Sequence, residues 1–150
     1  MSVNNRRKLM KAVDVERVKA AIGEAERQTS GEIRVSVARF FWGGVRAAAE
    51  RAFTRLGMAR TKDRNGVLFF IVPARKKFVV LGDAAIHARV GQEFWDSVAG
   101  LMSGHFKKGE FTEGLVAAIL EAGRELAAAF PYDATIDVNE LADDVDFGEN

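Results

Sequence analysis

The sequence predicts an α/β protein, a three-layer α/β/α sandwich in which about four helices cover a small mixed sheet of three to four strands. Three observations indicate this fold. The unbroken apolar run Val67–Val72 is too short for a buried helix and fits a central strand that is buried on both faces. A second apolar run, Phe78–Leu81, follows after a short polar turn and predicts an antiparallel hairpin. Amphipathic helical segments precede and follow this hairpin.

The segment before the hairpin predicts a helix, a strand and a second helix. From Asp14, which can cap a helix N-terminus, to about Gln28, apolar residues recur every three or four positions. Residues 32–39 alternate in polarity, which predicts a strand with one well-buried face. Residues 45–58 are rich in Ala and Arg and have helical periodicity. This order predicts a βαβ unit whose two strands are parallel.

The segment after the hairpin predicts three helical pieces. Asp83 stands where it can cap a short helical turn. Residues 92–105 and 112–130 each carry an apolar stripe at helical spacing, and Pro131 ends the second helix. Charged residues interrupt even the most apolar stretch, so we expect no membrane span.

Composition restricts the class of protein. At 150 residues the chain fits one domain with a substantial core. It contains no cysteine, which excludes disulfides, thiolate nucleophiles and Cys-ligated metals. The basic N-terminus lacks the apolar centre of a signal peptide. We therefore expect a cytoplasmic protein without a membrane anchor.

Charge is distributed unevenly along the chain. The net charge is +1, but seven of the 21 acidic residues lie from Asp133 onward, where there is no Lys or Arg. Residues 1–132 hold the other 14 acidic residues and all 22 basic ones, a net charge of +8. We predict a domain over 1–132 and an acidic tail over 133–150 that is either flexible or docked on the domain. Docking in extended form would use the apolar residues of the tail: Ile136, Val138, Leu141, Val145 and Phe147.

Several short motifs, each weak alone, occur in a specific order. They are Asn65-Gly66-Val67-Leu68, Gly82-Asp83 with Ile86-His87, Phe94-Trp95, the stretch FKKGEFTEGL at 106–115, and Asn139-Glu140-Leu141 followed by acidic residues. Together they resemble the TPM domain family, which includes thylakoid lumen proteins, photosystem II repair proteins and bacterial relatives. The last motif is similar to the tail of the soluble bacterial branch. The resemblance covers roughly residues 14–148, and Ala85 and Ala142 depart from an expected Gly and Pro.

The resemblance implies an α/β/α sandwich and a limited set of functions. Members of the family are associated with acid-phosphatase activity in a plant representative, with divalent-cation binding and with photosystem maintenance. Most relatives carry a signal peptide and a membrane anchor, patterns that this sequence lacks. We therefore expect a non-catalytic interaction or divalent-cation-binding module with an unknown protein partner. The alternative is a metal-dependent hydrolase similar to acid phosphatases.

The predicted topology also brings carboxylates to one edge of the sheet. The starts of the two parallel strands and the end of the third strand share that edge. Carboxylate and amide oxygens suit Ca²⁺ or Mg²⁺. Each residue has a simpler role too, because Asp83 can cap a helix, Asp63 and Asn65 are common in turns, and Glu32 can be solvated. We name this set the carboxylate edge: Glu32, Asp63, Asn65 and Asp83.

The opposite edge of the predicted sheet collects basic and aromatic residues. We name this set the aromatic–basic surface: Arg39, Phe40, Phe41, Trp42, Arg75, Lys76 and Lys77. Such a surface suits phosphate or single-stranded nucleic acid. The alternatives are a solvated turn beside core aromatics, an interface in a homo-oligomer, or a docking place for the acidic tail. We do not expect nucleic acid as a partner, because the chain carries no recognition motif.

The residues available for hydrolysis are few. The two histidines, His87 and His105, lie 18 positions apart and lack a same-face metal-binding spacing. There is no Gly-x-Ser-x-Gly motif and no Walker loop. We assign no catalytic residue, and a phosphatase would depend on a metal-bound water at Asp63 and Asp83.

Overall fold

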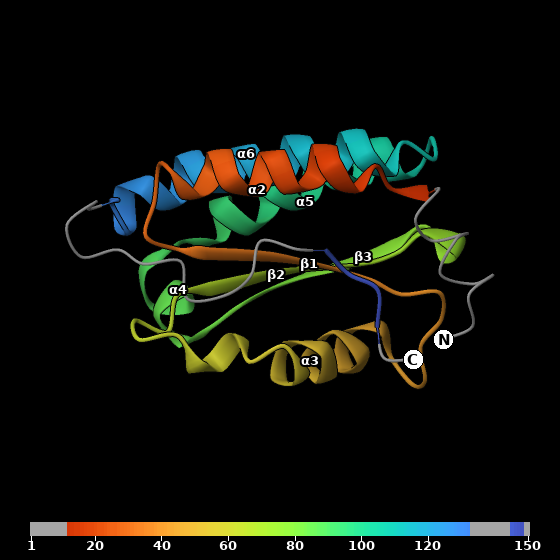
Figure 1. The fold of residues 1–150 in the computed structure, drawn as a ribbon, viewed down its shortest axis with the longest axis horizontal. Helices are drawn as coiled ribbons and strands as arrows, with labels where there is room; N and C mark the ends of the chain where they lie inside the picture. Colours follow the sequence, from red (N-terminus) through yellow and green to blue (C-terminus); the bar gives the residue numbers. More distant parts are fainter. Residues whose placement is uncertain (1–11, 133–144, 149–150) are drawn as a thin grey trace.

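The computed structural model describes residues 12–132 and 145–148 (Figure 1). In this part of the chain, five α-helices, four strands and two short 3₁₀ helices follow one another. They are α2 (Val15–Glu26), β1 (Glu32–Val37), α3 (Val45–Arg55), η1 (Met58–Arg60), β2 (Gly66–Val72), η2 (Pro73–Arg75), β3 (Lys77–Gly82), α4 (Ala84–Arg89), α5 (Gln92–Phe106), α6 (Phe111–Ala129) and β4 (Val145–Asp146).

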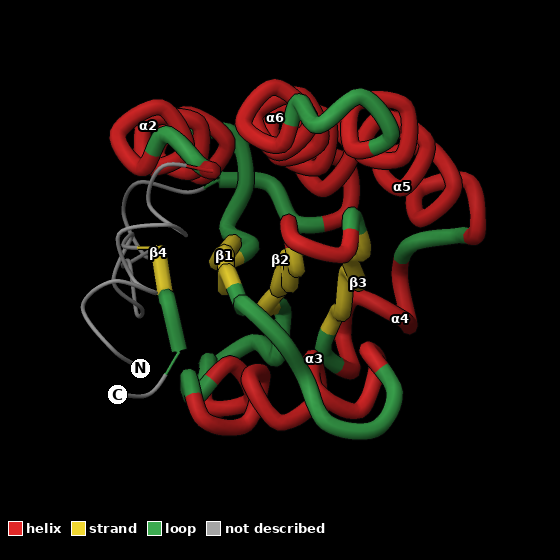
Figure 2. The backbone as a smooth tube through the Cα atoms, turned by 90° about the vertical axis from the view of Figure 1, so that its right-hand side faces the viewer, coloured by secondary structure: helices red, strands yellow, loops and turns green. Residues whose placement is uncertain are grey.

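The four strands form one mixed sheet in the order β3-β2-β1-β4. Strand β1 pairs in parallel with β2 and with β4, whereas β2 and β3 pair antiparallel. Figure 2 shows α2, α5 and α6 above the sheet and α3 below it. The predicted α/β/α sandwich, its parallel βαβ unit and its hairpin are therefore confirmed.

Both faces of β1 are buried, which differs from the single buried face predicted from its alternating sequence. All six residues of the strand are buried. The polar face holds Arg34 and Ser36, and each has a polar partner: Arg34 bonds Glu26 and Glu32, and Ser36 bonds Asp146. A polar alternation is thus compatible with a fully buried strand when charged partners accompany it.

Two predicted helices end earlier than their periodicity indicates. Helix α2 ends at Glu26 and α3 at Arg55. After α3 the chain passes through Gly57 with φ +72°, a left-handed conformation that glycine adopts without strain, and forms η1. Met58 of η1 is fully buried, so its apolar character reflects a second short element rather than a longer helix.

The core has two parts, one on each face of the sheet. The larger part lies between the sheet and helices α2, α5 and α6. The smaller part lies between the sheet and α3, whose buried face consists of Ala48, Ala49 and Ala52. Small residues also bring α2 and α6 close together. A Cβ at Gly123 of α6 would lie 2.7 Å from the Cβ of Ala25 in α2. Both helix contacts therefore depend on the absence of bulk.

The last described residues lie along β1. Val35 and Ser36 pair with Val145 and Asp146, and Val145 and Phe147 are buried in the larger core. This part of the acidic tail is docked in extended form. The other predicted anchors, Ile136, Val138 and Leu141, lie outside the described residues, and the domain division at 132 stays a prediction. None of the described helices has the length and apolarity needed to cross a membrane.

Candidate functional site

The backbone brings three members of the carboxylate edge together. Glu32 opposes Gly66 in the β1–β2 ladder, and its N–H donates to the Asn65 carbonyl at 3.2 Å. The Asp83 N–H donates to the Gly66 carbonyl at 2.9 Å, so the end of β3 lies beside the start of β2. Asn65 is buried and its Nδ2 donates to the Ser30 carbonyl at 3.2 Å. The fourth member, Asp63, is exposed in the turn before β2.

Arginines bind the two buried carboxylates of this edge. The guanidinium of Arg64 forms a bidentate pair with Asp83, with Nε–Oδ2 at 2.7 Å and Nη2–Oδ1 at 2.8 Å. Asp83 Oδ1 also accepts from the Ala84 N–H at 2.7 Å, which caps α4 as predicted. Glu32 Oε2 accepts from Arg34 Nη2 at 3.0 Å. Within the described ranges, no three His, Asp or Glu side chains are grouped to hold a metal ion, and cation binding here stays a prediction.

The Arg64 pair changes the acidity of Asp83. Hydrogen bonds from Arg64 lower the pKa of Asp83 below its ordinary 3.8, although partial desolvation acts in the opposite direction. Because the pKa is lowered in the folded state, the pair stabilises the fold above pH 3.8, and this contribution is lost as pH falls through the lowered value.

Replacing Arg64 should therefore have a pH-dependent effect. We expect Arg64→Ala to lower the melting temperature at pH 7 and to differ less from wild type at pH 2, because protonation of Asp83 at low pH removes the charge that Arg64 pairs with. Thermal unfolding across this pH range measures the difference. Arg60→Ala, at an exposed arginine of η1, is the control and should show no such trend. An Arg64→Ala effect of equal size at both pH values would contradict the assignment.

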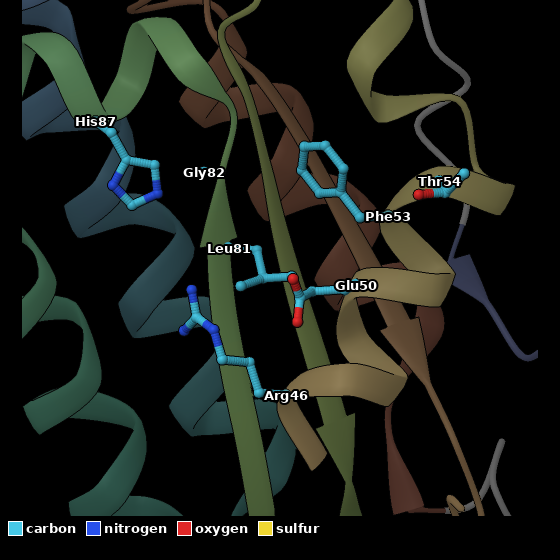
Figure 3. Close-up of a pocket in the computed structure, with 7 residues that line it drawn as sticks. All are labelled: Arg46, Glu50, Phe53, Thr54, Leu81, Gly82 and His87. Atoms are coloured by element: carbon cyan, nitrogen blue, oxygen red, sulfur yellow. The ribbon is translucent and has the colours of Figure 1, made fainter. Parts of the chain in front are cut away.

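A cleft of about 310 Å³ opens beside this edge, between α3 and the end of β3 (Figure 3). Its lining is Arg46, Glu50, Phe53, Thr54, Leu81, Gly82 and His87. In Figure 3, Arg46 and Glu50 extend from α3 over Leu81, and His87 faces them from α4. The His87 ring stacks on Trp95, with centroids 5.2 Å apart. The sequence analysis compared His87 only with His105 and missed this grouping, because Arg46 and Glu50 come from a helix about forty residues earlier.

Contacts between loops assemble the aromatic–basic surface at the other end of the sheet. The Arg75 guanidinium lies 4.9 Å from the centre of the Phe41 ring, a cation–π distance that joins the β1–α3 loop to the β2–β3 turn. Arg51 of α3 donates from Nη2 to the Trp42 carbonyl at 3.1 Å. Phe40 and Trp42 meet edge to face, with centroids 6.1 Å apart.

A groove of about 480 Å³ runs between this loop and α3. Its lining includes Ser36, Phe41, Trp42, Arg51 and Gly148. The groove lies at the carboxyl end of β1, where Ser36 and Ala38 line it. In open α/β sheets, ligands commonly bind outside the carboxyl ends of the strands.

The docked tail contributes a charge next to the groove. Asp146 pairs with Arg55 of α3, with Nη1–Oδ1 at 3.0 Å and Nη2–Oδ2 at 2.7 Å, and accepts from Ser36 Oγ at 2.7 Å. Burial alone would raise the pKa of Asp146, but the bonds from Arg55 and Ser36 hold it below its ordinary value. The acidic tail thus contacts α3 rather than the Arg75–Lys77 turn in the residues described.

Comparison with known proteins places the chain among its relatives. The sequence profile of the TPM domain matches residues 3–125. No curated protein sequence matches. The NMR structure of the BA42 protein from the psychrophilic bacterium Bizionia argentinensis is 36% identical, with a TM-score of 0.85 over 93% of this chain and 94% of that one.

Two other solved structures share the fold at low identity. The N-terminal domain of a P. gingivalis protein is 17% identical, with a TM-score of 0.60 over 74% of this chain and 72% of that one. The N-terminal domain of the cg2496 protein from Corynebacterium glutamicum is 11% identical, with a TM-score of 0.59 over 90% and 78%. With a profile match over most of its length and a 36% identical relative along nearly all of it, the chain belongs to the TPM domain family.

Proposed function

We propose that this TPM domain is a non-catalytic binding module and that its aromatic–basic surface binds an anionic partner. The observation that carries the proposal is the exposure of Phe40 and Trp42 beside cationic side chains. The seven residues of the surface are Arg, Lys, Phe and Trp, which supply cations and aromatic faces. These groups suit recognition, because catalysis by proton transfer needs a group that titrates near the working pH.

The local charge supports an anionic partner. Residues 38–55, which comprise the β1–α3 loop and α3, have four basic residues and a single acidic one, Glu50. Residues 73–77, the turn between β2 and β3, have three basic residues and no acidic one. A surface of one sign raises the local concentration of oppositely charged partners and speeds their association.

Heparin, a soluble polyanion, tests this proposal. We expect Arg39→Glu combined with Lys77→Glu to weaken heparin binding roughly tenfold, because the substitutions reverse two charges within the surface. Fluorescence titration or elution from a heparin column measures the change. The matched control is Arg27→Glu with Arg60→Glu, two exposed arginines at the opposite end of the sheet. Equal weakening by both pairs would show that only net charge matters and would overturn the proposal.

Divalent-cation binding at the carboxylate edge is a second candidate function. It is favoured by the approach of Glu32, Asn65 and Asp83 through backbone hydrogen bonds. Arg64 now holds Asp83 and would compete with a cation for the same oxygens. The side chain of Arg64 is 52% exposed, so it can move into solvent when a cation replaces it at the buried Asp83 carboxylate.

Thermal unfolding with Ca²⁺, Mg²⁺ and EDTA tests the cation site. A ligand at about a hundred times its Kd stabilises a fold by about 2.7 kcal/mol, which would raise the melting temperature by several degrees. We expect millimolar cation to raise it in wild type, to raise it further in Arg64→Ala, and to have no effect in Asp83→Asn. Asp14→Asn is the control, because Asp14 caps α2 just as Asp83 caps α4.

The same variants test the hydrolase alternative. Cation-dependent turnover of p-nitrophenyl phosphate that is lost in Asp83→Asn but kept in Asp14→Asn would support a metal-bound water as nucleophile. His87, in the neighbouring cleft, would then be the available proton donor. Turnover that survives Asp83→Asn would exclude this edge as the reaction centre.

A further inference from the structure

We propose that the anionic partner of the aromatic–basic surface is a lipid bilayer containing acidic phospholipid, on which the domain docks peripherally. The inference rests on the proposed function and names its partner. It depends on three features of the described residues: a protruding aromatic loop, the ordering of that loop, and the basic side chains around it.

The aromatic loop exposes two large rings. Trp42 is 78% exposed and Phe40 56% exposed. Among the described residues, the one other exposed large hydrophobic side chain is that of Tyr132, which lies beyond α6 at the opposite end of the sheet. Indole and phenyl rings are stabilised at the boundary between lipid headgroups and acyl chains. The β1–α3 loop thus carries the side chains suited to insertion at that depth.

The loop is held in place from behind. Arg51 of α3 bonds the Trp42 carbonyl, and Arg75 packs against the Phe41 ring. Gly43, which follows Trp42 in the turn, has φ +71°. This left-handed backbone conformation is strained for a residue with a side chain, and glycine adopts it freely. An ordered loop loses little conformational entropy when it binds, which favours docking without refolding.

Basic side chains surround the loop. Arg39, Lys76 and Lys77 are exposed at this end of the sheet. The Lys76 Nζ lies 3.5 Å from the Lys107 carbonyl, which brings the exposed Lys107 and Lys108 of the α5–α6 turn into the same region. Each Lys or Arg near an anionic membrane strengthens binding about fivefold.

The acidic residues near this end lie outside the aromatic loop. Asp14, Glu16 and Glu113 belong to α2 and α6 in the upper helical layer. The Glu110 carboxylate, in the α5–α6 turn, lies 2.9 Å from His105, and Asp146, next to the groove, is held by Arg55 and Ser36. In Figure 1 the loop between β1 and α3 lies at the lower corner of this end, away from α2 and α6. The domain can therefore present its basic side and its aromatic loop together.

Ring geometry favours a bilayer over single-stranded nucleic acid. The Phe40 and Trp42 rings stand at 89° to each other. Successive bases need separate aromatic faces on which to stack along a groove. An edge-to-face pair offers one compact apolar tip, which suits insertion into a bilayer.

Vesicle co-sedimentation of the whole chain tests the proposal. We expect the protein to bind vesicles made of equal amounts of phosphatidylglycerol and phosphatidylcholine at low salt. Binding should be weak to vesicles of phosphatidylcholine alone, and weak to either kind of vesicle at high salt.

Substitutions on the surface should reduce this binding. Trp42→Ala should weaken vesicle binding at least tenfold, and so should Arg39→Glu with Lys77→Glu. The controls Tyr132→Ala and Arg27→Glu with Arg60→Glu should bind like wild type. In a Trp95→Phe background, checked for its fold by thermal unfolding, Trp42 fluorescence should shift to the blue on binding.

Other results would overturn the membrane assignment. No binding to acidic vesicles, or equal loss in the control variants, would do so, and so would binding without a blue shift of Trp42. A wild-type dimer that Trp42→Ala converts to a monomer without any vesicle binding would assign the loop to a contact between copies. If heparin binding depends on Arg39 and Lys77 but no vesicles bind, the membrane proposal is overturned and the proposed anion-binding module is retained. If neither heparin nor vesicles bind, both proposals are overturned.

Discussion

Replacing Arg34 by alanine should destabilise the fold by about 3–5 kcal/mol, the effect expected when one partner of a buried ion cluster is removed. The Arg34 side chain is 5% exposed. Its Nη1 bonds Glu26 at 2.7 Å and its Nη2 bonds Glu32 at 3.0 Å, and it also donates to the Ile33 carbonyl. Without the guanidinium, two carboxylates remain in a poorly solvated position. Urea unfolding measures this as a lower midpoint with little change in slope.

Partner substitutions separate the lost charge from lost packing. The triple variant Arg34→Met, Glu26→Gln and Glu32→Gln should regain most of the lost stability, because replacing a whole buried ion cluster by neutral groups is often nearly neutral. Arg34→Lys keeps the charge but loses the forked geometry, and it should fall between wild type and Arg34→Ala. A loss below about 1 kcal/mol for Arg34→Ala would contradict the interpretation, since that value is typical of exposed ion pairs.

Replacing Gly123 by alanine should destabilise the fold by about 2 kcal/mol, although alanine is the better helix former. The added Cβ would lie 2.7 Å from the Ala25 Cβ and 2.9 Å from the Ala25 Cα. The second contact is with backbone, so α2 and α6 would have to move apart. Chemical denaturation of the purified variant measures the change in the free energy of unfolding.

Two further variants test the cause. Gly104→Ala, in α5, meets no atom within 4 Å of its new Cβ and should stabilise the fold by about 0.5–1 kcal/mol through helix propensity. Ala25→Gly should reduce the cost of Gly123→Ala, and a double-mutant cycle would report a favourable coupling between the two substitutions. Independent effects of the two would show that the helix contact is not the cause.

The position of the aromatic–basic surface follows from the directions of the strands in the sheet. Two parallel strands end at the same edge, so the residues after β1 and after β2 had to lie near each other. Periodicity also indicated that Val145 and Phe147 were anchors of an extended tail. It could not show that Arg75 would lie on the Phe41 ring or that Asp146 would bond Arg55, because these contacts depend on side-chain positions across elements.

At the carboxylate edge, strand directions predicted which residues lie near one another but not which side chains pair. Topology predicted that Glu32, Asn65 and Asp83 would approach one another, and backbone hydrogen bonds join them. The arginines that hold the two buried carboxylates were not predicted. Arg64 is 19 positions from Asp83, and Arg34 connects β1 to α2 through Glu26. Glu32 and Arg34 share one face of β1, which strand alternation indicates, but no short-range pattern marks the Arg64–Asp83 or the Arg34–Glu26 pair.

Sequence patterns alone were enough to predict the α/β class, the central hairpin, the helices and the edges at which chemistry-bearing residues gather. Each of these depends on the spacing of apolar residues within one segment, which local physics translates into a buried face. The tertiary structure decided which charges pair, how closely α2 approaches α6 and which aromatic rings stay in solvent. These depend on distances of a few ångströms between segments far apart in the chain, where an ion pair or a single methyl group changes the outcome.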